Sequence, residues 1–115
     1  NISINSTFFM NRKIISAIIN KSHLKSFFLK PYGLELLFIL EEAEEEGLDN
    51  GIDDTWQQVA SMRMQKTVFA NYVKNLVELK SVTLRTSDFK KSKKILRLSR
   101  EAAKELAEIR KTFPD

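Results

Sequence analysis

Apolar residues recur three to four positions apart along most of the chain, which is the spacing of helices that bury one face. The spacing predicts helices over residues 11–29, from Leu34 to Glu46, around Trp56, over about 66–79, and from Ser99 to Pro114. Pro31 and Gly33 separate the first two, because proline disfavours helical geometry in the residue before it. The second is apolar on most sides up to Ala43, which predicts a central, buried helix ending at Gly47.

The short helix around Trp56 is expected to begin at a cap, Asp53 or Asp54, and to place Val59, Ala60 and Met62 on its apolar side. A turn over 62–65 would lead into the helix over 66–79. Two β-prone runs, Ser81–Arg85 and Lys94–Leu98, then flank a polar segment and predict a hairpin over Val82–Leu98. Ser99 is of the type that caps the helix after it.

Helix, helix, hairpin and helix in this order are typical of a winged helix-turn-helix. The predicted fold class is therefore mainly α with a small β-hairpin (α+β). Residues 11–115 would form one domain, and the Ser/Asn-rich residues 1–10 a flexible arm. The apolar helix over 11–29 is expected to pack against a second copy, which predicts a homodimer.

The charge is strongly partitioned along the chain. Residues 1–40 carry a net charge of +4, residues 41–54 of −8 and residues 55–115 of +8, so the total is +4. This favours a polyanion-binding face in the second half, with the acidic patch 41–54 placed elsewhere. The alternative is that these lysines and glutamates simply solvate helices. Double-stranded DNA is the leading partner.

A recognition helix over about 66–79 would bury Phe69, Leu76, Val77 and either Tyr72 or Val73, and present a polar face to the major groove. That face carries amide, hydroxyl and ammonium groups that can contact base edges and phosphates: Gln65, Lys66, Thr67, Asn71, Lys74 and Asn75. It has no arginine, which favours A/T-leaning or semi-specific binding. The alternative is an ordinary polar helix surface.

The hairpin tip over 86–94 is the wing of this interpretation, placed on the minor groove and phosphates. Its lysines supply salt-sensitive affinity, and the arginines at the strand ends, Arg85 and Arg97, are expected near the tip. The lysines are Lys90, Lys91, Lys93 and Lys94. Lysines also protect exposed strand edges from pairing, which is the alternative explanation.

The run Val77–Arg85, with Leu98–Ser99 thirteen residues further on, resembles the MarR family of winged-helix transcriptional regulators, as does Tyr32–Gly33–Leu34. The family ends its recognition helix in a Leu-Glu-x-Lys-Gly-Leu-like run and opens the helix after the wing with Leu-Thr. Here Ser81 replaces the glycine, Ala102 stands where the family often has glycine, and Lys90–Lys91–Ser92 replaces the wing's Asp-Arg-Arg. The resemblance implies a dimeric DNA-binding regulator, with Lys91 nearest to the wing arginine.

Other chemistry is weakly represented. The sequence has no cysteine and one histidine, His23, which is expected on a surface or interface, and no nucleophile beside a base, so we expect no enzyme, cofactor or metal site. The loop 49–54 lacks the ligand spacing of a calcium loop. Trp56 and the phenylalanines are expected in the core. We expect a cytoplasmic protein without a membrane span.

The alternative function is a protein-interaction module or accessory DNA-binding subunit of a replication, conjugation or secretion assembly, docking through helix 11–29 or patch 41–54.

Overall fold

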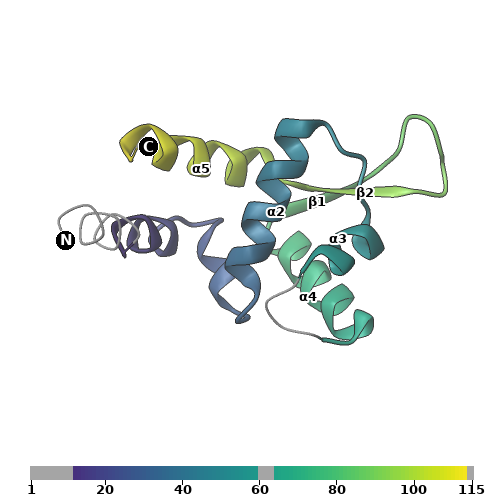
Figure 1. The fold of residues 1–115 in the computed structure, drawn as a ribbon, viewed down its shortest axis with the longest axis horizontal. Coiled ribbons are helices and arrows are strands. Elements are labelled where there is room, and N and C mark those ends of the chain that lie inside the picture. The colour runs from purple at the N-terminus through teal and green to yellow at the C-terminus, as the bar shows by residue number, and fades with distance from the viewer. Residues whose placement is uncertain (1–11, 60–63, 114–115) are drawn as a thin grey trace.

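The structure, a computed structural model, describes residues 12–59 and 64–113. Residues 12–19 are helical, and the elements that follow are η1 (Lys25–Phe28, a 3₁₀-helix), α2 (Gly33–Glu46), α3 (Ile52–Gln58), α4 (Lys66–Glu78), β1 (Val82–Thr86), β2 (Lys94–Leu98) and α5 (Arg100–Thr112) (Figure 1). The predicted α+β class, with one antiparallel hairpin, is confirmed. The expected arm over 1–10 lies outside the described residues.

Helix α2 is the centre of the core, as its all-round apolar sequence predicts. It contacts η1, α3 and β2, and its Leu36, Leu37 and Leu40 are almost completely buried. The helix starts where Gly33 approaches the carbonyl oxygen of Phe27 so closely that a side chain would collide with it. It ends at Gly47, whose φ of 65° is left-handed, a conformation that glycine adopts without strain.

The continuous helix expected over 11–29 is wrong. The described helix stops at residue 19, a turn follows over 20–24, and the chain resumes as η1. At the turn the backbone N–H of His23 donates to Oε1 of Glu105 in α5 at 3.0 Å, so this amide has no helical partner. Ile18, Leu24 and Phe27 are buried within the same chain, whereas Ile15 and Ile19 stay exposed.

The hairpin forms in the predicted place, with Val82 paired to Leu98 and Thr86 to Lys94. Its second strand has a further neighbour, because the N–H of Leu96 donates to the carbonyl oxygen of Asn50 at 2.8 Å. The loop between α2 and α3 therefore runs along β2, which explains why most of β2 is buried.

The start of α3 differs from the prediction. Gly51, not an aspartate, is the N-cap, and Asp54 occupies the third helical position, where its carboxylate accepts the N–H of Gly51 at 3.2 Å. The helix ends at Gln58, and Val59 is extended. Of the other expected apolar positions, Ala60 and Met62 lie outside the described residues, as does part of the turn over 62–65.

Helix α4 ends at Glu78, and Lys80, which follows the C-cap Leu79, has a left-handed φ of 61°. The N–H of Lys80 donates to the carbonyl of Val77 and that of Ser81 to the carbonyl of Leu76, which is the Schellman pattern of helix termination. The buried Ser81 hydroxyl lies 2.6 Å from that of Ser26 and donates to the carbonyl of His23. The junction between α4 and β1 is thereby tied to the turn before η1.

Helix α5 begins as predicted, with Ser99 Oγ accepting the N–H of Ala102. Ion pairs then connect α5 to residues 21–41, and α5 and the N-terminal helix lie at the same end of the molecule (Figure 1). These pairs are Lys21–Glu108, His23–Glu105 and Arg110–Glu41. No helix within the described ranges is long and apolar enough to cross a membrane.

Candidate nucleic-acid interface

Helix α4 buries one side and exposes a polar one, as predicted. Phe69, Tyr72, Val73 and Leu76 are buried, at the spacing of a single helix face. Val77 was also expected inside but is partly exposed, because it lies at the edge of this face. Burial, with a further contribution from Tyr32, raises the pKa of the Tyr72 phenol, which donates to the carbonyl of Ser26 at 2.8 Å.

The side of α4 opposite the buried residues holds the candidate base-reading groups. Thr67, Asn71 and Lys74 follow one another at helical spacing, and the other predicted residues, Gln65, Lys66 and Asn75, are exposed as well. Gln65 is the N-cap but makes no side-chain capping hydrogen bond, so its amide is not committed to the helix. We name this set, residues 65–67, 71, 74 and 75, the α4 polar face.

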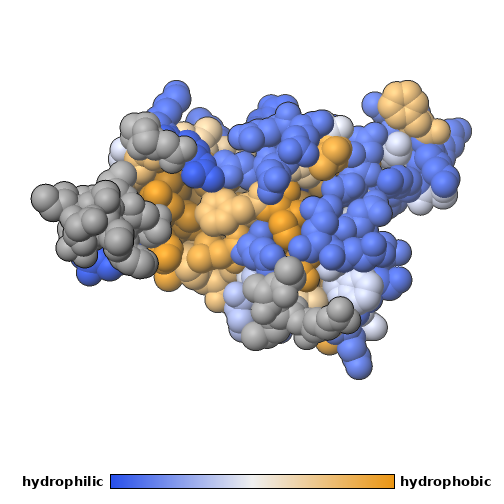
Figure 2. All heavy atoms as spheres, viewed as in Figure 1, coloured by the Kyte–Doolittle hydropathy of each residue, from blue (hydrophilic) through white to orange (hydrophobic). Residues whose placement is uncertain are grey.

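The hairpin tip, residues 86–94, projects beyond the helices at the end of the molecule opposite the α5 terminus (Figure 1). All four predicted lysines lie on it. Lys90 and Lys91 are exposed and have no ion-pair partner among the described residues. Lys94 Nζ donates to Thr86 Oγ1 at 3.1 Å, while Lys93 is engaged by an aspartate. Figure 2 shows hydrophilic side chains over most of this end.

The first turn of α3 connects the start of α4 to the hairpin tip. Asp53 Oδ1 lies 3.3 Å from Lys66 Nζ, and Asp54 Oδ2 lies 3.5 Å from Lys93 Nζ. The two lysines therefore contact neighbouring aspartates, which places the start of α4 and the hairpin tip on one surface. The expectation that the whole acidic segment lies away from the basic surface is therefore wrong for these aspartates.

The two strand arginines have different environments. Arg85 is exposed on β1, opposite Ile95. Arg97 pairs with Thr83 at the end of the hairpin away from the tip, so its predicted place beside the tip is wrong. It is buried, where its guanidinium contacts Glu44 at 2.7 Å and the carbonyl of Leu48. Arg97 therefore holds the strand against α2 and leaves the candidate interface.

The aromatic residues also divide. Trp56 is half-buried, and its indole N–H donates to the carbonyl of Met64 at 3.0 Å, consistent with a structural role. Phe27 and Phe69 are fully buried, as expected. Phe89 is the exception, because 92% of it is exposed at the hairpin tip. The prediction of a buried position is wrong for Phe89. The run of polar residues around it was the sequence signal that it is exposed.

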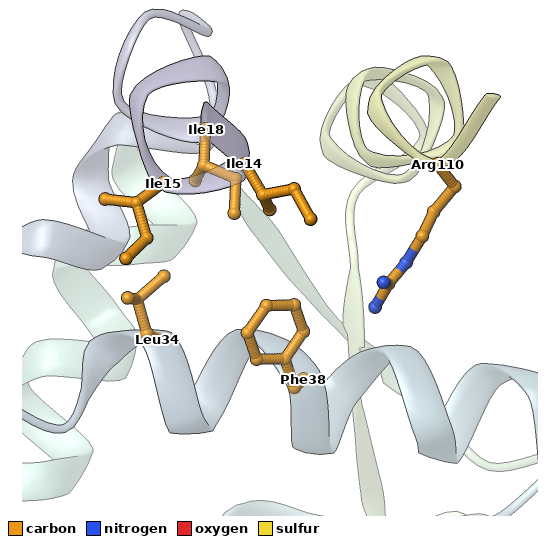
Figure 3. A pocket seen from close by; sticks show the side chains of 6 residues that line it. All are labelled: Ile14, Ile15, Ile18, Leu34, Phe38 and Arg110. Atoms are coloured by element: carbon orange, nitrogen blue, oxygen red, sulfur yellow. The ribbon is translucent and has the colours of Figure 1, made fainter. Parts of the chain in front are cut away.

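A second candidate site lies at the other end of the molecule, where apolar surface is exposed (Figure 2). Isoleucines of the N-terminal helix face side chains of α2 across a pocket of about 410 Å³, and Arg110 reaches toward it from α5 (Figure 3). The lining residues are Ile14, Ile15, Ile18, Leu34, Phe38 and Arg110. Arg110 is held in a two-point contact with Glu41 and lies over the Phe38 ring.

The residues that the structure describes contain no cluster of histidine, aspartate or glutamate arranged to hold a metal ion. His23 Nδ1 lies 2.8 Å from Glu105 Oε2, which gives this histidine a place in the contact between the turn at 20–24 and α5. Comparison with protein-family models, curated proteins and solved structures finds no match to the chain.

Proposed function

We propose that this chain binds double-stranded DNA as a winged helix-turn-helix of a divergent MarR-like type. Helices α3 and α4 would be the helix-turn-helix and the β1–β2 hairpin its wing. The observation that carries the proposal is the pair of contacts Asp53–Lys66 and Asp54–Lys93, by which the start of α4 and the hairpin tip lie next to each other on one surface. A duplex lying on that surface would meet both elements together.

In this proposal the α4 polar face reads the major groove. Asparagine and glutamine amides can form paired hydrogen bonds with adenine, and threonine can contact a thymine methyl or a phosphate. Asn71 is central to the face, and its neighbours Thr67 and Lys74 lie one turn to either side. Since the face has no arginine, we propose semi-specific, A/T-leaning recognition.

The hairpin tip contributes affinity that does not depend on sequence. Lys90 and Lys91 are free of ion pairs among the described residues, so binding a phosphate breaks no internal contact. Each phosphate neutralised releases a counterion, which makes affinity fall with salt. Arg85, exposed on the first strand of the hairpin, is placed to add a further phosphate contact.

The proposal is tested by titrating a labelled mixed-sequence duplex with the wild-type chain at increasing salt. We expect log K to fall linearly with log salt, and the double variant Lys90→Ala/Lys91→Ala to reduce the slope by roughly 2. The matched control is Lys104→Ala/Lys111→Ala on α5, which removes the same charge far from the hairpin tip and should leave the slope unchanged. No binding at low salt would refute the proposal.

We further propose that the chain acts as a homodimeric transcriptional regulator. Ile15 and Ile19 leave apolar surface exposed on the N-terminal helix, and a second copy packed there would bury it. Two α4 helices would then face half-sites about 34 Å apart. Analytical ultracentrifugation tests this by comparing the mass in solution of the wild type with that of the double variant Ile15→Glu/Ile19→Glu. We expect the wild type to be a dimer and the variant to be a monomer.

The alternative is a protein-interaction module within a larger DNA-handling assembly. It is favoured by the apolar pocket between the N-terminal helix and α2 (Figure 3). A pull-down with and without nuclease separates the two, because a partner bridged by DNA is lost on digestion. Retention of a partner after digestion, together with no DNA affinity in the titration, would favour the module.

A further inference from the structure

Phe89 is the most exposed large apolar side chain within the described residues. It is 92% exposed, whereas the next, Leu29, is 57% exposed. Leaving a phenylalanine in water forfeits about 1.5–3 kcal/mol relative to burying it. Single exposed apolar residues are common on protein surfaces, so it is the place of this ring, on a projecting hairpin beside the exposed Lys90 and Lys91, that suggests a ligand.

The backbone around Phe89 is held in place although its ring contacts little. The buried Ser87 hydroxyl accepts the N–H groups of Phe89 and Lys90, at 3.2 and 3.3 Å. The N–H of Ser87 donates to the carbonyl of Lys93 at 2.9 Å, and that of Lys93 to the carbonyl of Lys90. These bonds close the loop, so the ring is presented at a defined point and little loop entropy is lost on binding.

The charges beside the ring indicate a polyanion. Lys90 and Lys91 follow it directly and are exposed, with no ion pair among the described residues. A nucleic acid combines phosphates with flat bases on which an aromatic ring can stack. An anionic membrane also combines charge with apolar surface, but membrane-binding segments bury a whole helix face, and here one ring is available.

We propose that Phe89 is a wedge that enters the minor groove and stacks on a base at an opened step, while Lys90 and Lys91 hold the flanking phosphates. Proteins that insert apolar side chains in this way unstack a base step and kink the duplex. The inference rests on the proposed DNA binding and adds a preference. DNA that opens easily, such as a duplex with a mismatch, should be bound more tightly than fully paired DNA.

The test uses two duplexes of the same sequence, one fully paired and one with a central mismatch beside 2-aminopurine, a fluorescent base that brightens when unstacked. We expect the wild type to bind the mismatched duplex about tenfold more tightly, because a mismatched step costs less free energy to unstack than a paired one. It should also change the 2-aminopurine signal beyond the level of the free mismatched duplex. Phe89→Ala should lose both effects and keep the salt slope, whereas Phe89→Trp should retain both.

Leu29→Ala is the matched control, because it removes another exposed apolar side chain away from the hairpin tip. It should behave as the wild type. If the wild type binds both duplexes and Phe89→Ala keeps the mismatch preference and the signal, the wedge is overturned while DNA binding stands. If the wild type binds neither duplex, the proposed function fails as well. In that case, the wild type and Phe89→Ala are each sedimented with phosphatidylcholine–phosphatidylglycerol vesicles. Sedimentation of the wild type but not of Phe89→Ala would show that the ring binds a membrane.

Discussion

At the scale of single residues, backbone conformation and burial decide the roles of side chains that look alike in sequence. Lys74 and Lys80 are both exposed lysines on or beside α4, but Lys80 has a φ of 61°. A left-handed conformation costs a residue with a Cβ roughly 1–2 kcal/mol, and glycine avoids this cost. Lys80 is therefore in a strained backbone conformation, and the Schellman hydrogen bonds hold it there.

Replacing Lys80 with glycine should raise the free energy of unfolding by about 0.5–1 kcal/mol, after the greater flexibility of glycine in the unfolded chain is subtracted. Lys74→Gly, in the middle of α4, should lower it by about 1 kcal/mol. Urea denaturation of the two variants measures this contrast. Equal losses for both would show that Lys80 is not strained.

Tyr72 should make the free energy of unfolding depend on pH in the alkaline range. Its pKa is raised in the folded chain, so above about pH 10 the unfolded chain loses the proton more readily than the folded one. The stabilising contribution is complete below pH 10 and is lost as pH rises toward the folded pKa, by at most about 1.4 kcal/mol per pH unit. Tyr72→Phe should have a shallower alkaline loss than the wild type in denaturation curves, and identical slopes would contradict the prediction.

Phe89 illustrates what the sequence could and could not predict at this scale. The polar run around it indicated a hairpin tip, but the usual burial of phenylalanine favoured the core. For Arg97 the error is the reverse: the sequence predicts a position near the hairpin tip, and the structure buries the residue. A position in a strand does not reveal that a loop from elsewhere in the chain covers that strand. The contact between Leu96 and Asn50, which buries that strand, joins segments far apart in sequence.

At the scale of elements, the local sequence predicted α2, α4, the hairpin and α5 well, because each has an apolar, amphipathic or β-prone run with its own end signals. The prediction failed over 11–29, where the apolar spacing continues through the whole segment but the helix stops at residue 19. The turn there depends on Glu105, which lies in α5 and supplies a carboxylate to the amide of His23. Such a partner cannot be recognised from a local pattern.

Arg97 joins β2 to the end of α2, and its removal should destabilise the fold. Arg97→Ala leaves Glu44 and the Leu48 carbonyl without a donor, and we expect a loss of about 2 kcal/mol, because Glu44 is partly exposed and can be rehydrated. Arg85→Ala, on the exposed side of the same hairpin, should change stability by less than about 0.5 kcal/mol. Thermal unfolding compares the two, and similar losses would contradict this role for Arg97.

The aspartates of α3 should weaken DNA binding, because they occupy lysines that would otherwise meet phosphates. Asp54→Asn should release Lys93, raise affinity at low salt and steepen the salt slope by about 1. Glu101→Gln, at the start of α5, makes the same charge change elsewhere and should leave the slope as it is. An unchanged slope for Asp54→Asn would mean that Lys93 does not reach the DNA.

At the scale of the whole molecule, the charge partition seen in the sequence acquires a structural meaning. Residues of the acidic segment 41–54 pair with basic residues of the second half, which joins the two halves of the chain. These acidic residues are Glu41, Glu44, Asp49, Asp53 and Asp54. The sequence indicated opposite charges but not their pairing, which only the folded chain determines.

Amide chemical-shift mapping of the ¹⁵N-labelled chain can show whether α4 and the hairpin tip bind one duplex together. Adding a short duplex at low salt should shift amides of the α4 polar face and of residues 86–94, with little change in α5. Shifts confined to residues 12–19 and α5, or no shifts at all, would show that α4 and the hairpin tip do not bind a duplex together.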